Sequence, residues 1–162
     1  ERPESMEICF ASESDYRRII EAPSVHGPIT DTSGKVIGEH TGIANYTLGQ
    51  RKGLGIAWKK PLFVTEIRPC DNTIVASERE AAFSDVVRAS GMNIQADEFI
   101  CGGSVLYGKI RSQGEPEECT VTFTSDGTAE ARFKNPVFAP APGQRLVLYT
   151  GEGILAAGGS II

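Results

Sequence analysis

A short segment, residues 45–56, gathers residue types that could bind a phosphate backbone. Gln50, Arg51 and Lys52 place an amide and two adjacent cations at one point of the chain. The segment also holds three glycines: Gly49, Gly53 and Gly55. Glycine adopts positive φ angles and lets another surface come close. An ordinary tight turn with solvated charges fits the same pattern, and composition alone favours that simpler interpretation.

Cysteine chemistry is a second possibility. The chain has four cysteines: Cys9, Cys70, Cys101 and Cys119. They form no C-x-x-C pair, and the two histidines, His26 and His40, lack the spacing of a metal finger. We therefore expect no metal site, and no stable disulfide in a cytosolic chain. Either one cysteine is catalytic, or all four are small buried hydrophobic residues.

The composition is that of an ordinary globular chain. With 162 residues, 40% hydrophobic and 23% charged, it suits one domain or two small ones. The start, residues 1–4, is charged and lacks the apolar core of a signal peptide, and no apolar run is long enough to span a bilayer. We therefore expect a cytoplasmic protein with no membrane contact.

The net charge limits the ways in which the chain could bind nucleic acid. A charge of −5 argues against non-specific binding, because general nucleic-acid binders are usually basic. Any RNA contact must come from a local patch of cations. The candidates are Arg51, Lys52, Lys59, Lys60, Lys109 and Arg111.

Most of the chain has the pattern of short strands separated by turns. The expected strands are 28–30, 35–40, 62–68, 73–77, 83–88, 104–111, 119–124, 128–133, 145–149 and 154–157. One short helix is expected at residues 15–22, where Pro23 stops its continuation. Short strands with regular turns and almost no helix predict a mainly β chain built from small barrels.

The expected organisation is a tail followed by two small β domains. Residues 91–103 have few strong strand formers and include a pair of glycines, so we place a division near Gly91. The predicted parts are a tail at 1–14, a central β domain at 15–91 and a C-terminal β-barrel at 92–162.

Four ordered motifs resemble one known family. Residues 45–56 are similar to Y-T-x-G-Q-R-K-G-L-G-I, and residues 2–10 to K-P-x-S-x-x-I-C-F. Two further segments match in the same order. They are the glycine-containing stretch at 27–42 and the end of the chain, where residues 142–144 and 158–162 match. The family is that of the tRNA-specific 2-thiouridylases, which replace O2 of the wobble uridine with sulfur. Its members have sometimes been described as tRNA methyltransferases, but no glycine-rich nucleotide loop supports methyl transfer here.

The resemblance implies a C-terminal fragment of such an enzyme. Family members begin with an ATP-binding domain that carries an S-G-G-x-D-S-S loop and a first catalytic cysteine, and neither motif is in this sequence. ATP would therefore be bound by that domain, and we expect this chain to be inactive alone. The resemblance also implies that the C-terminal barrel is similar to the second domain of elongation factor Tu.

Cys9 is the catalytic candidate that the resemblance singles out. It matches the I-C-F cysteine, which carries sulfur as a persulfide in the family. This chemistry requires a thiolate, and the nearby Glu4 and Glu7 would raise rather than lower the thiol pKa. The implied partners are tRNA, the ATP-binding domain and a persulfide donor of the sulfur-carrier or cysteine-desulfurase type. The alternative is that Cys9 is only a small hydrophobic residue between Ile8 and Phe10.

The RNA contacts implied by the resemblance are more diffuse. Gln50, Arg51 and Lys52 would contact tRNA or brace the loop near the wobble base, with the loop glycines setting its shape. Lys109 and Arg111 match a K-I-R stretch expected to face tRNA, although the outer face of a strand is an equal alternative. We assign no role to either histidine, which we expect at turns or the surface, and we interpret Cys70, Cys101 and Cys119 as structural or incidental.

Two other functions remain open from the sequence. The chain could be a non-catalytic RNA-binding β-barrel module in which Cys9 is a core residue. It could also be a protein-interaction barrel whose acidic surface recognises a basic partner. Replacement of Cys9 would abolish thiolation if the chain is an enzyme fragment and would have no effect if it is an RNA-binding module. A failure to bind tRNA would favour the protein-interaction barrel.

Overall fold

The computed structural model describes residues 25–100, 105–124 and 127–162. Its strands are β1 Gly27–Thr30, β2 Val36–His40, β3 Leu62–Arg68, β4 Thr73–Glu78, β5 Phe83–Ile94, β6 Val105–Lys109, β7 Glu117–Phe123, β8 Ala129–Phe138, β9 Arg145–Tyr149 and β10 Leu155–Ile161. Short 3-10 turns lie at η2 Ile43–Asn45, η3 Arg79–Ala82 and η4 Asp97–Phe99. The predicted mainly β chain is confirmed, and the predicted tail and helix lie outside the described residues.

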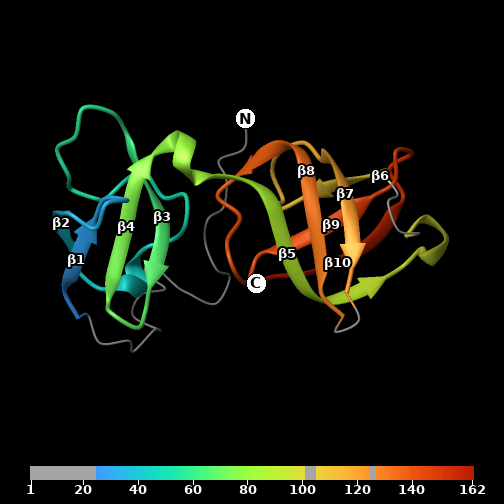
Figure 1. Cartoon of the computed structure of the whole chain (residues 1–162), viewed down its shortest axis with the longest axis horizontal. Helices are drawn as coiled ribbons and strands as arrows, with labels where there is room; N and C mark the ends of the chain where they lie inside the picture. Colours follow the sequence, from blue (N-terminus) through green and yellow to red (C-terminus); the bar gives the residue numbers. More distant parts are fainter. Residues whose placement is uncertain (1–24, 101–104, 125–126) are drawn as a thin grey trace, which may run out of the picture.

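The strands form two separate units that lie side by side (Figure 1). The first is a four-stranded sheet in the order β2-β1-β4-β3, in which β1 and β4 run parallel. The second is a closed barrel in the order β10-β5-β8-β7-β6-β9, as the prediction of a C-terminal β-barrel requires. Closure pairs every barrel strand on both sides and so leaves no free edge.

Each unit has its own hydrophobic core. The barrel interior is filled by inward residues of its strands, including Val87, Leu106 and Leu146. The core of the sheet includes Ile29, Val64 and Ile74. The two clusters share no residue, so each unit is packed independently.

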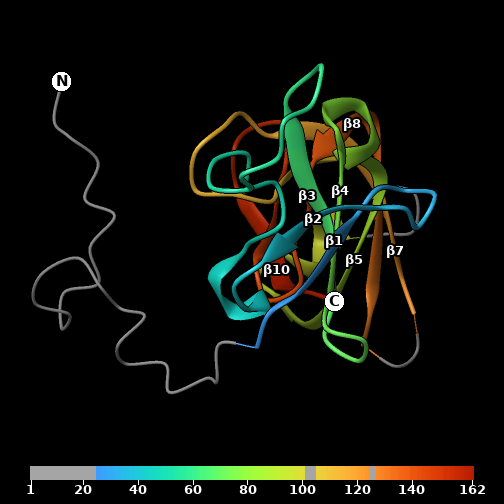
Figure 2. The same ribbon diagram turned by 90° about the vertical axis from the view of Figure 1, so that its left-hand side faces the viewer.

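A long segment between η2 and β3, coloured teal to green in Figure 2, contacts both edge strands of the first sheet. Gly49 donates its N–H to the Val64 carbonyl at 2.8 Å, and the Val64 N–H donates to the Gln50 carbonyl at 3.0 Å. At the far end of the segment, a Cβ placed on Gly38 of β2 would lie 2.8 Å from Ile56. The segment therefore runs from one edge strand, β3, to the other, β2.

The change from one unit to the other occurs earlier than the predicted division at Gly91. Strand β5 joins the barrel from Phe83 onward, directly after η3, and Gly91 lies inside it. Opposite β10, the pairing shifts between Ser90 and Asn93, and Gly91 has a φ of 60°. The glycine that suggested a break is therefore part of a β-bulge, which a strand tolerates without ending.

Strand β8 also continues beyond its predicted end. Pro136 follows Phe133, but β8 extends to Phe138 because the proline falls where the pairing with β5 is irregular. Its neighbour Val137 resumes the pairing opposite Ser84. A proline at a bulge removes no ladder hydrogen bond, so the strand can pass it.

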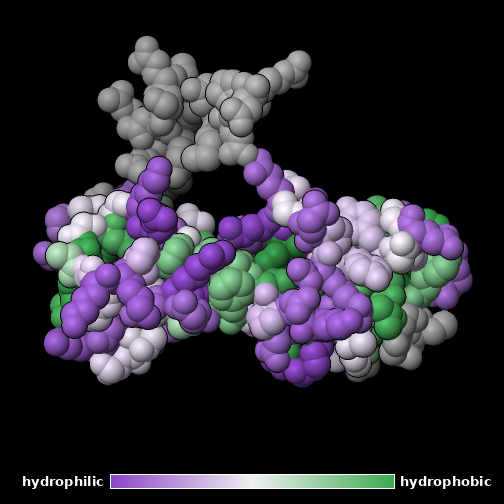
Figure 3. All heavy atoms as spheres, turned by 90° about the horizontal axis from the view of Figure 1, so that it is seen from above, coloured by the Kyte–Doolittle hydropathy of each residue, from purple (hydrophilic) through white to green (hydrophobic). Residues whose placement is uncertain are grey.

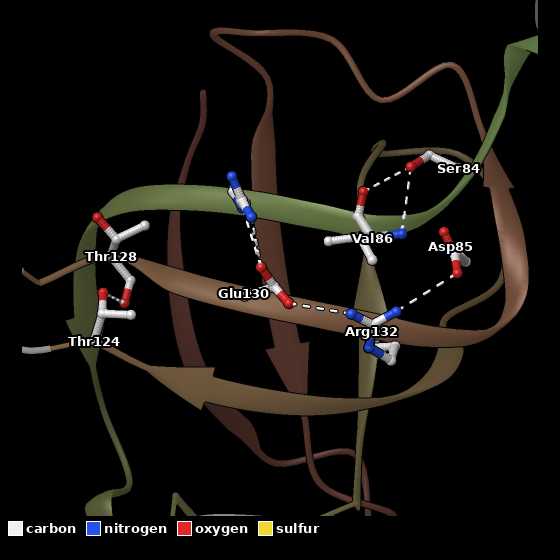
Figure 4. Close-up of polar contacts among 8 residues, drawn as sticks. Ser84, Asp85, Val86, Thr124, Thr128, Glu130 and Arg132 are labelled. Carbon is white, nitrogen blue, oxygen red and sulfur yellow. Dashed lines mark hydrogen bonds and ion pairs between the residues drawn. The ribbon is translucent and has the colours of Figure 1, made fainter.

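The outer face of the barrel at β5 and β8 is covered by a network of ion pairs (Figure 4). Arg132 lies 3.6 Å from Asp85 and 3.3 Å from Glu130, which also accepts from Arg88 at 3.0 Å. Exposed pairs of this kind add little to stability. They do, however, pair the cations of this face with carboxylates of the protein itself.

One predicted surface residue is buried. His40, the last residue of β2, is 0% exposed. Its Nδ1 accepts from the Gly42 N–H at 3.1 Å, so its Nε2 carries the proton and donates to the Asn72 carbonyl at 2.9 Å. The expectation of a turn or surface histidine was wrong because the ring has two backbone partners that lie on different segments.

Candidate functional site

The segment of residues 45–56, here called the glycine loop, has the backbone shape that its glycines suggest. Gly49, Gly53 and Gly55 have φ angles of 81°, 82° and 66°. Side chains other than hydrogen are strained in this left-handed region. The loop is therefore held in a conformation that few sequences could adopt.

The side chain of Gln50 is used inside the glycine loop. Its Oε1 accepts from the Thr47 N–H at 3.0 Å, and its Nε2 donates to the Lys52 carbonyl at 2.9 Å. Both ends of the amide thus tie the loop to itself. This geometry favours the bracing interpretation of Gln50 over a direct contact with RNA.

A hollow of about 660 Å³ lies between the glycine loop and the start of β3. It is lined by Arg51, Gly53, Leu54, Gly55, Ile56, Ala57, Trp58, Lys59, Lys60, Pro61 and Leu62. Three of these side chains are cations, and no carboxylate is among the described residues of the lining. We call this feature the loop hollow.

The glycine loop meets the barrel at one aromatic residue, Phe138. A Cβ placed on Gly49 would lie 2.9 Å from the Ala139 Cβ and 3.2 Å from the Phe138 ring. Arg111, two residues beyond the end of β6, donates to the Ala139 carbonyl at 3.0 Å. The close approach brings the predicted residues Gly49 and Arg111 together, although they come from different units.

Four side chains surround the Phe138 ring and form what we call the joint. The rings of Phe63 and Phe83 meet it edge to face, with centroids 5.5 Å and 5.3 Å away. The guanidinium groups of Arg79 and Arg111 lie 5.3 Å and 5.7 Å from its centroid. Aromatic pairs and cation–π contacts of this geometry are favourable beyond the area they bury. The joint fixes the glycine loop against the barrel.

A second hollow, of about 690 Å³, lies on the barrel. Its lining is Lys109, Ile110, Arg111, Ser112, Gln113, Gly143, Gln144, Arg145, Val147 and Tyr149. The lining therefore includes the whole K-I-R stretch, with its cations Lys109 and Arg111, and one more cation, Arg145. We call it the barrel hollow.

The cations of the molecule divide into two groups by their partners. Lys60, Arg68, Arg88, Arg132 and Lys134 each form a salt bridge with a carboxylate. Within the described ranges, no salt bridge is formed by Lys35, Arg51, Lys52, Lys59, Arg79, Lys109, Arg111 or Arg145. Most of this second group lines the two hollows or the joint. Within the described ranges, positive charge without a carboxylate partner is thus concentrated where the two units meet and on the adjoining barrel surface.

Comparison with known proteins connects this arrangement to a family. Residues 18–78 match the family described as tRNA methyl transferase PRC-barrel domain, and residues 100–162 match the aminomethyltransferase beta-barrel domain. A tRNA-specific 2-thiouridylase MnmA of Lachnoclostridium phytofermentans is 40% identical over 99% of this chain and 46% of its own length. Proteins of the same name from Koribacter versatilis and Clostridioides difficile are 36% and 35% identical, over 98% and 99% of this chain.

The chain belongs to the tRNA-specific 2-thiouridylase family. It spans less than half the length of the curated 2-thiouridylases that it matches, with 46% and 45% of the first two covered. The match is to the C-terminal part of the family.

The cysteines of the chain fall into separate environments. Cys9 and Cys101 lie outside the described residues, and Cys70 is exposed. Cys119 is 1% exposed, and burial raises the pKa of its thiol to about 11. A thiol so strongly protonated is a poor nucleophile, so Cys119 has a structural role.

The described part of the chain has neither a metal-binding cluster nor a membrane-spanning helix. It holds no group of three or more His, Cys, Asp or Glu side chains arranged for a metal ion. None of its helices is long and apolar enough to cross a membrane.

The joint was not predicted from the sequence. Arg79 and Phe138 were not candidates, because no local motif marks them and their contact depends on the pairing of distant strands. The only available signal is that three phenylalanines, at 63, 83 and 138, occur at or near strand ends. That pattern alone does not predict which of them meet.

Proposed function

We propose that this chain is the tRNA-binding C-terminal part of a 2-thiouridylase that thiolates the wobble uridine. The observation that carries the proposal is the distribution of unpaired cations. Arg51, Lys59, Lys109, Arg111 and Arg145 line the two hollows without a carboxylate partner, in a chain whose net charge is −5. A phosphate backbone would supply the missing anions. Figure 3 shows hydrophilic residues spread over both units on the face that it draws.

The proposed reaction places the sulfur on Cys9. ATP, bound by an N-terminal domain, would activate O2 of the uridine as a leaving group. The terminal sulfur of a Cys9 persulfide would then bond to C2 as AMP departs. A cysteine thiolate of the N-terminal domain would attack the Cys9 sulfur, which releases the thiolated base and leaves a disulfide with Cys9. A dithiol reductant would reduce this disulfide and be oxidised to its own disulfide, after which a persulfide donor of the sulfur-carrier or cysteine-desulfurase type would reload the free Cys9 thiolate.

This scheme makes the chain inactive without its ATP-binding partner. The cytoplasmic location that we propose follows from the tRNA substrate. Gln50 would act as a brace of the glycine loop, whereas Arg51, Lys52, Lys109 and Arg111 would contact tRNA phosphates. These contacts would position the tRNA without reading its sequence.

The RNA-binding part of the proposal is tested by comparing unpaired with paired cations. Arg51→Gln and Lys109→Gln should each weaken binding of unmodified tRNA and reduce the slope of log affinity against log salt by about 0.7 to 1. Arg132→Gln is the matched control, because Arg132 is bonded to Asp85 and Glu130. Equal losses in all three variants, or no loss in any, would contradict the proposed surface.

The catalytic part is tested by reconstitution. The chain is mixed with a separately expressed ATP-binding domain of the family, unmodified tRNA, ATP and a persulfide donor, and 2-thiouridine is measured by mass spectrometry. We expect product with the wild-type chain and none with Cys9→Ser. Intact thiolation by Cys9→Ser would remove Cys9 from the mechanism, and tRNA binding without any product would favour a non-catalytic RNA-binding module.

A further inference from the structure

Trp58 occupies an unusual place in the first unit. It is the single tryptophan of the chain and is 45% exposed. It lies between the glycine loop and the start of β3. Its side chain is part of the lining of the loop hollow.

The chain on both sides of Trp58 is anchored in the core. Leu54 and Leu62 are each 7% exposed and belong to the core cluster of the sheet, and Ile56 packs against that cluster. Trp58 is not part of this cluster. The neighbouring anchors therefore hold a large aromatic side chain at the surface, where its burial contributes little to folding.

The charged residues that line the loop hollow are all cations. Of the three cations that line the loop hollow, Lys60 is bonded to Glu78 at 2.6 Å. Arg51 and Lys59 form no salt bridge within the part of the chain that the structure describes. A flat aromatic surface beside two unpaired cations is the combination by which proteins bind unpaired nucleotides, since every base can stack and every nucleotide carries a phosphate.

We propose that the loop hollow binds an unpaired nucleotide of the RNA, with Trp58 stacked on its base and Arg51 and Lys59 on the adjacent phosphates. The proposal rests on the proposed function in that the RNA is tRNA. It adds a stacking residue that the glycine-loop motif does not contain. The stacking requires a base that is not enclosed in a duplex, so the site takes a loop or single-stranded part of the RNA.

The intrinsic fluorescence of the chain reports directly on this contact, because Trp58 is its single tryptophan. The wild-type chain is titrated with unmodified tRNA, with a single-stranded oligouridylate and with a fully paired RNA duplex at the same phosphate concentration. We expect quenching by the tRNA and the oligouridylate, and little quenching by the duplex. Shielding from acrylamide in the bound state should follow the same order.

The affinity of variants is measured separately, by anisotropy of labelled tRNA. Trp58→Ala should weaken binding about tenfold, while Trp58→Phe should retain most of the affinity because it retains an aromatic ring. Phe99→Ala is the matched control: Phe99 is also an exposed aromatic, 37% exposed, but it lies beside Asp97 and Glu98 on η4. It should leave binding unchanged. Circular dichroism melting of Trp58→Ala confirms that this exposed position is not needed for folding.

The outcomes separate this inference from the proposed function. If tRNA binds but neither fluorescence nor the Trp58→Ala affinity changes, the stacking site is wrong and the proposed function stands. If the wild-type chain does not bind tRNA, the proposed RNA-binding function is wrong. If the oligouridylate also gives no quenching, the nucleotide site is wrong as well. Quenching by an acidic peptide but not by RNA would overturn the inference in favour of a protein partner.

Discussion

The guanidinium of Arg111 lies 5.7 Å from the centroid of the Phe138 ring and at the same time donates to the Ala139 carbonyl at 3.0 Å. A single cation thus connects the end of β6 to the end of β8, at the point where the glycine loop packs through Gly49. Its charge is not neutralised by a carboxylate among the described residues. Arg111 therefore holds the joint and still presents positive charge to the barrel hollow.

This double role predicts that Arg111 and Lys109 differ in their effect on stability. Arg111→Ala removes the cation–π contact and a hydrogen bond, so it should lower the free energy of unfolding by about 1 to 2 kcal/mol. Lys109→Ala removes no such contact and should change stability by less than about 0.5 kcal/mol. Urea unfolding followed by circular dichroism measures both values. Equal stability of the two variants would mean that the Arg111 contacts do not hold the joint.

Gly49 and Gly55 offer a matched pair for the glycine loop. Both have positive φ, so alanine at either position should cost about 1 to 2 kcal/mol of backbone strain. At Gly49 the added Cβ would also lie 2.9 Å from the Ala139 Cβ, whereas at Gly55 it would meet nothing within 4 Å. Gly49→Ala should therefore be the more destabilising in urea unfolding. A larger loss for Gly55→Ala would contradict the close packing of the loop on the barrel.

The parts of the fold that could be predicted from the sequence are those set by neighbouring residues. The hairpin turn at Gly34 and the loop glycines are recognisable because a positive φ is a local requirement. Strand β9 has the predicted bounds, because alternating Leu146 and Leu148 mark one buried face.

Features that depend on strand pairing could not be predicted in this way. The bulge at Gly91 resembles a domain break in the sequence, because only the partner strand β10 shows that pairing continues beyond it. The joint has the same origin. Phe138 reaches Phe63 because β8 passes Pro136 at an irregular point of its pairing with β5, and no local pattern encodes that register. The candidate site was therefore predictable as a loop but not as a contact between two units.

The two histidines provide a test of burial, since only one has backbone partners on both ring nitrogens. His40→Ala would leave a cavity at a residue that is 0% exposed and would remove the partners of the Gly42 N–H and the Asn72 carbonyl. We expect a loss of about 3 kcal/mol in the free energy of unfolding. His26→Ala is the control, because the His26 side chain is 62% exposed, and should cost less than about 0.5 kcal/mol. Similar losses for the two variants would contradict the burial and the two backbone hydrogen bonds of the His40 ring.

The buried thiol of Cys119 predicts a specific loss of stability in alkali. Burial raises its pKa from 9.0 to about 11, so the thiol is protonated in both the folded and the unfolded chain below pH 9. As the pH rises from 9 towards 11, the unfolded chain releases this proton and the folded chain does not. The free energy of unfolding should therefore fall across that window, by up to about 2 to 3 kcal/mol.

Cys119→Ala isolates this contribution, because tyrosines and lysines titrate in both proteins. The variant loses some stability at every pH, but its free energy of unfolding should decline less steeply between pH 9 and 11 than that of the wild-type chain. Urea unfolding at a series of pH values measures the two slopes. Parallel slopes would mean that the thiol titrates alike in the folded and unfolded states, in conflict with a side chain that is 1% exposed inside the barrel.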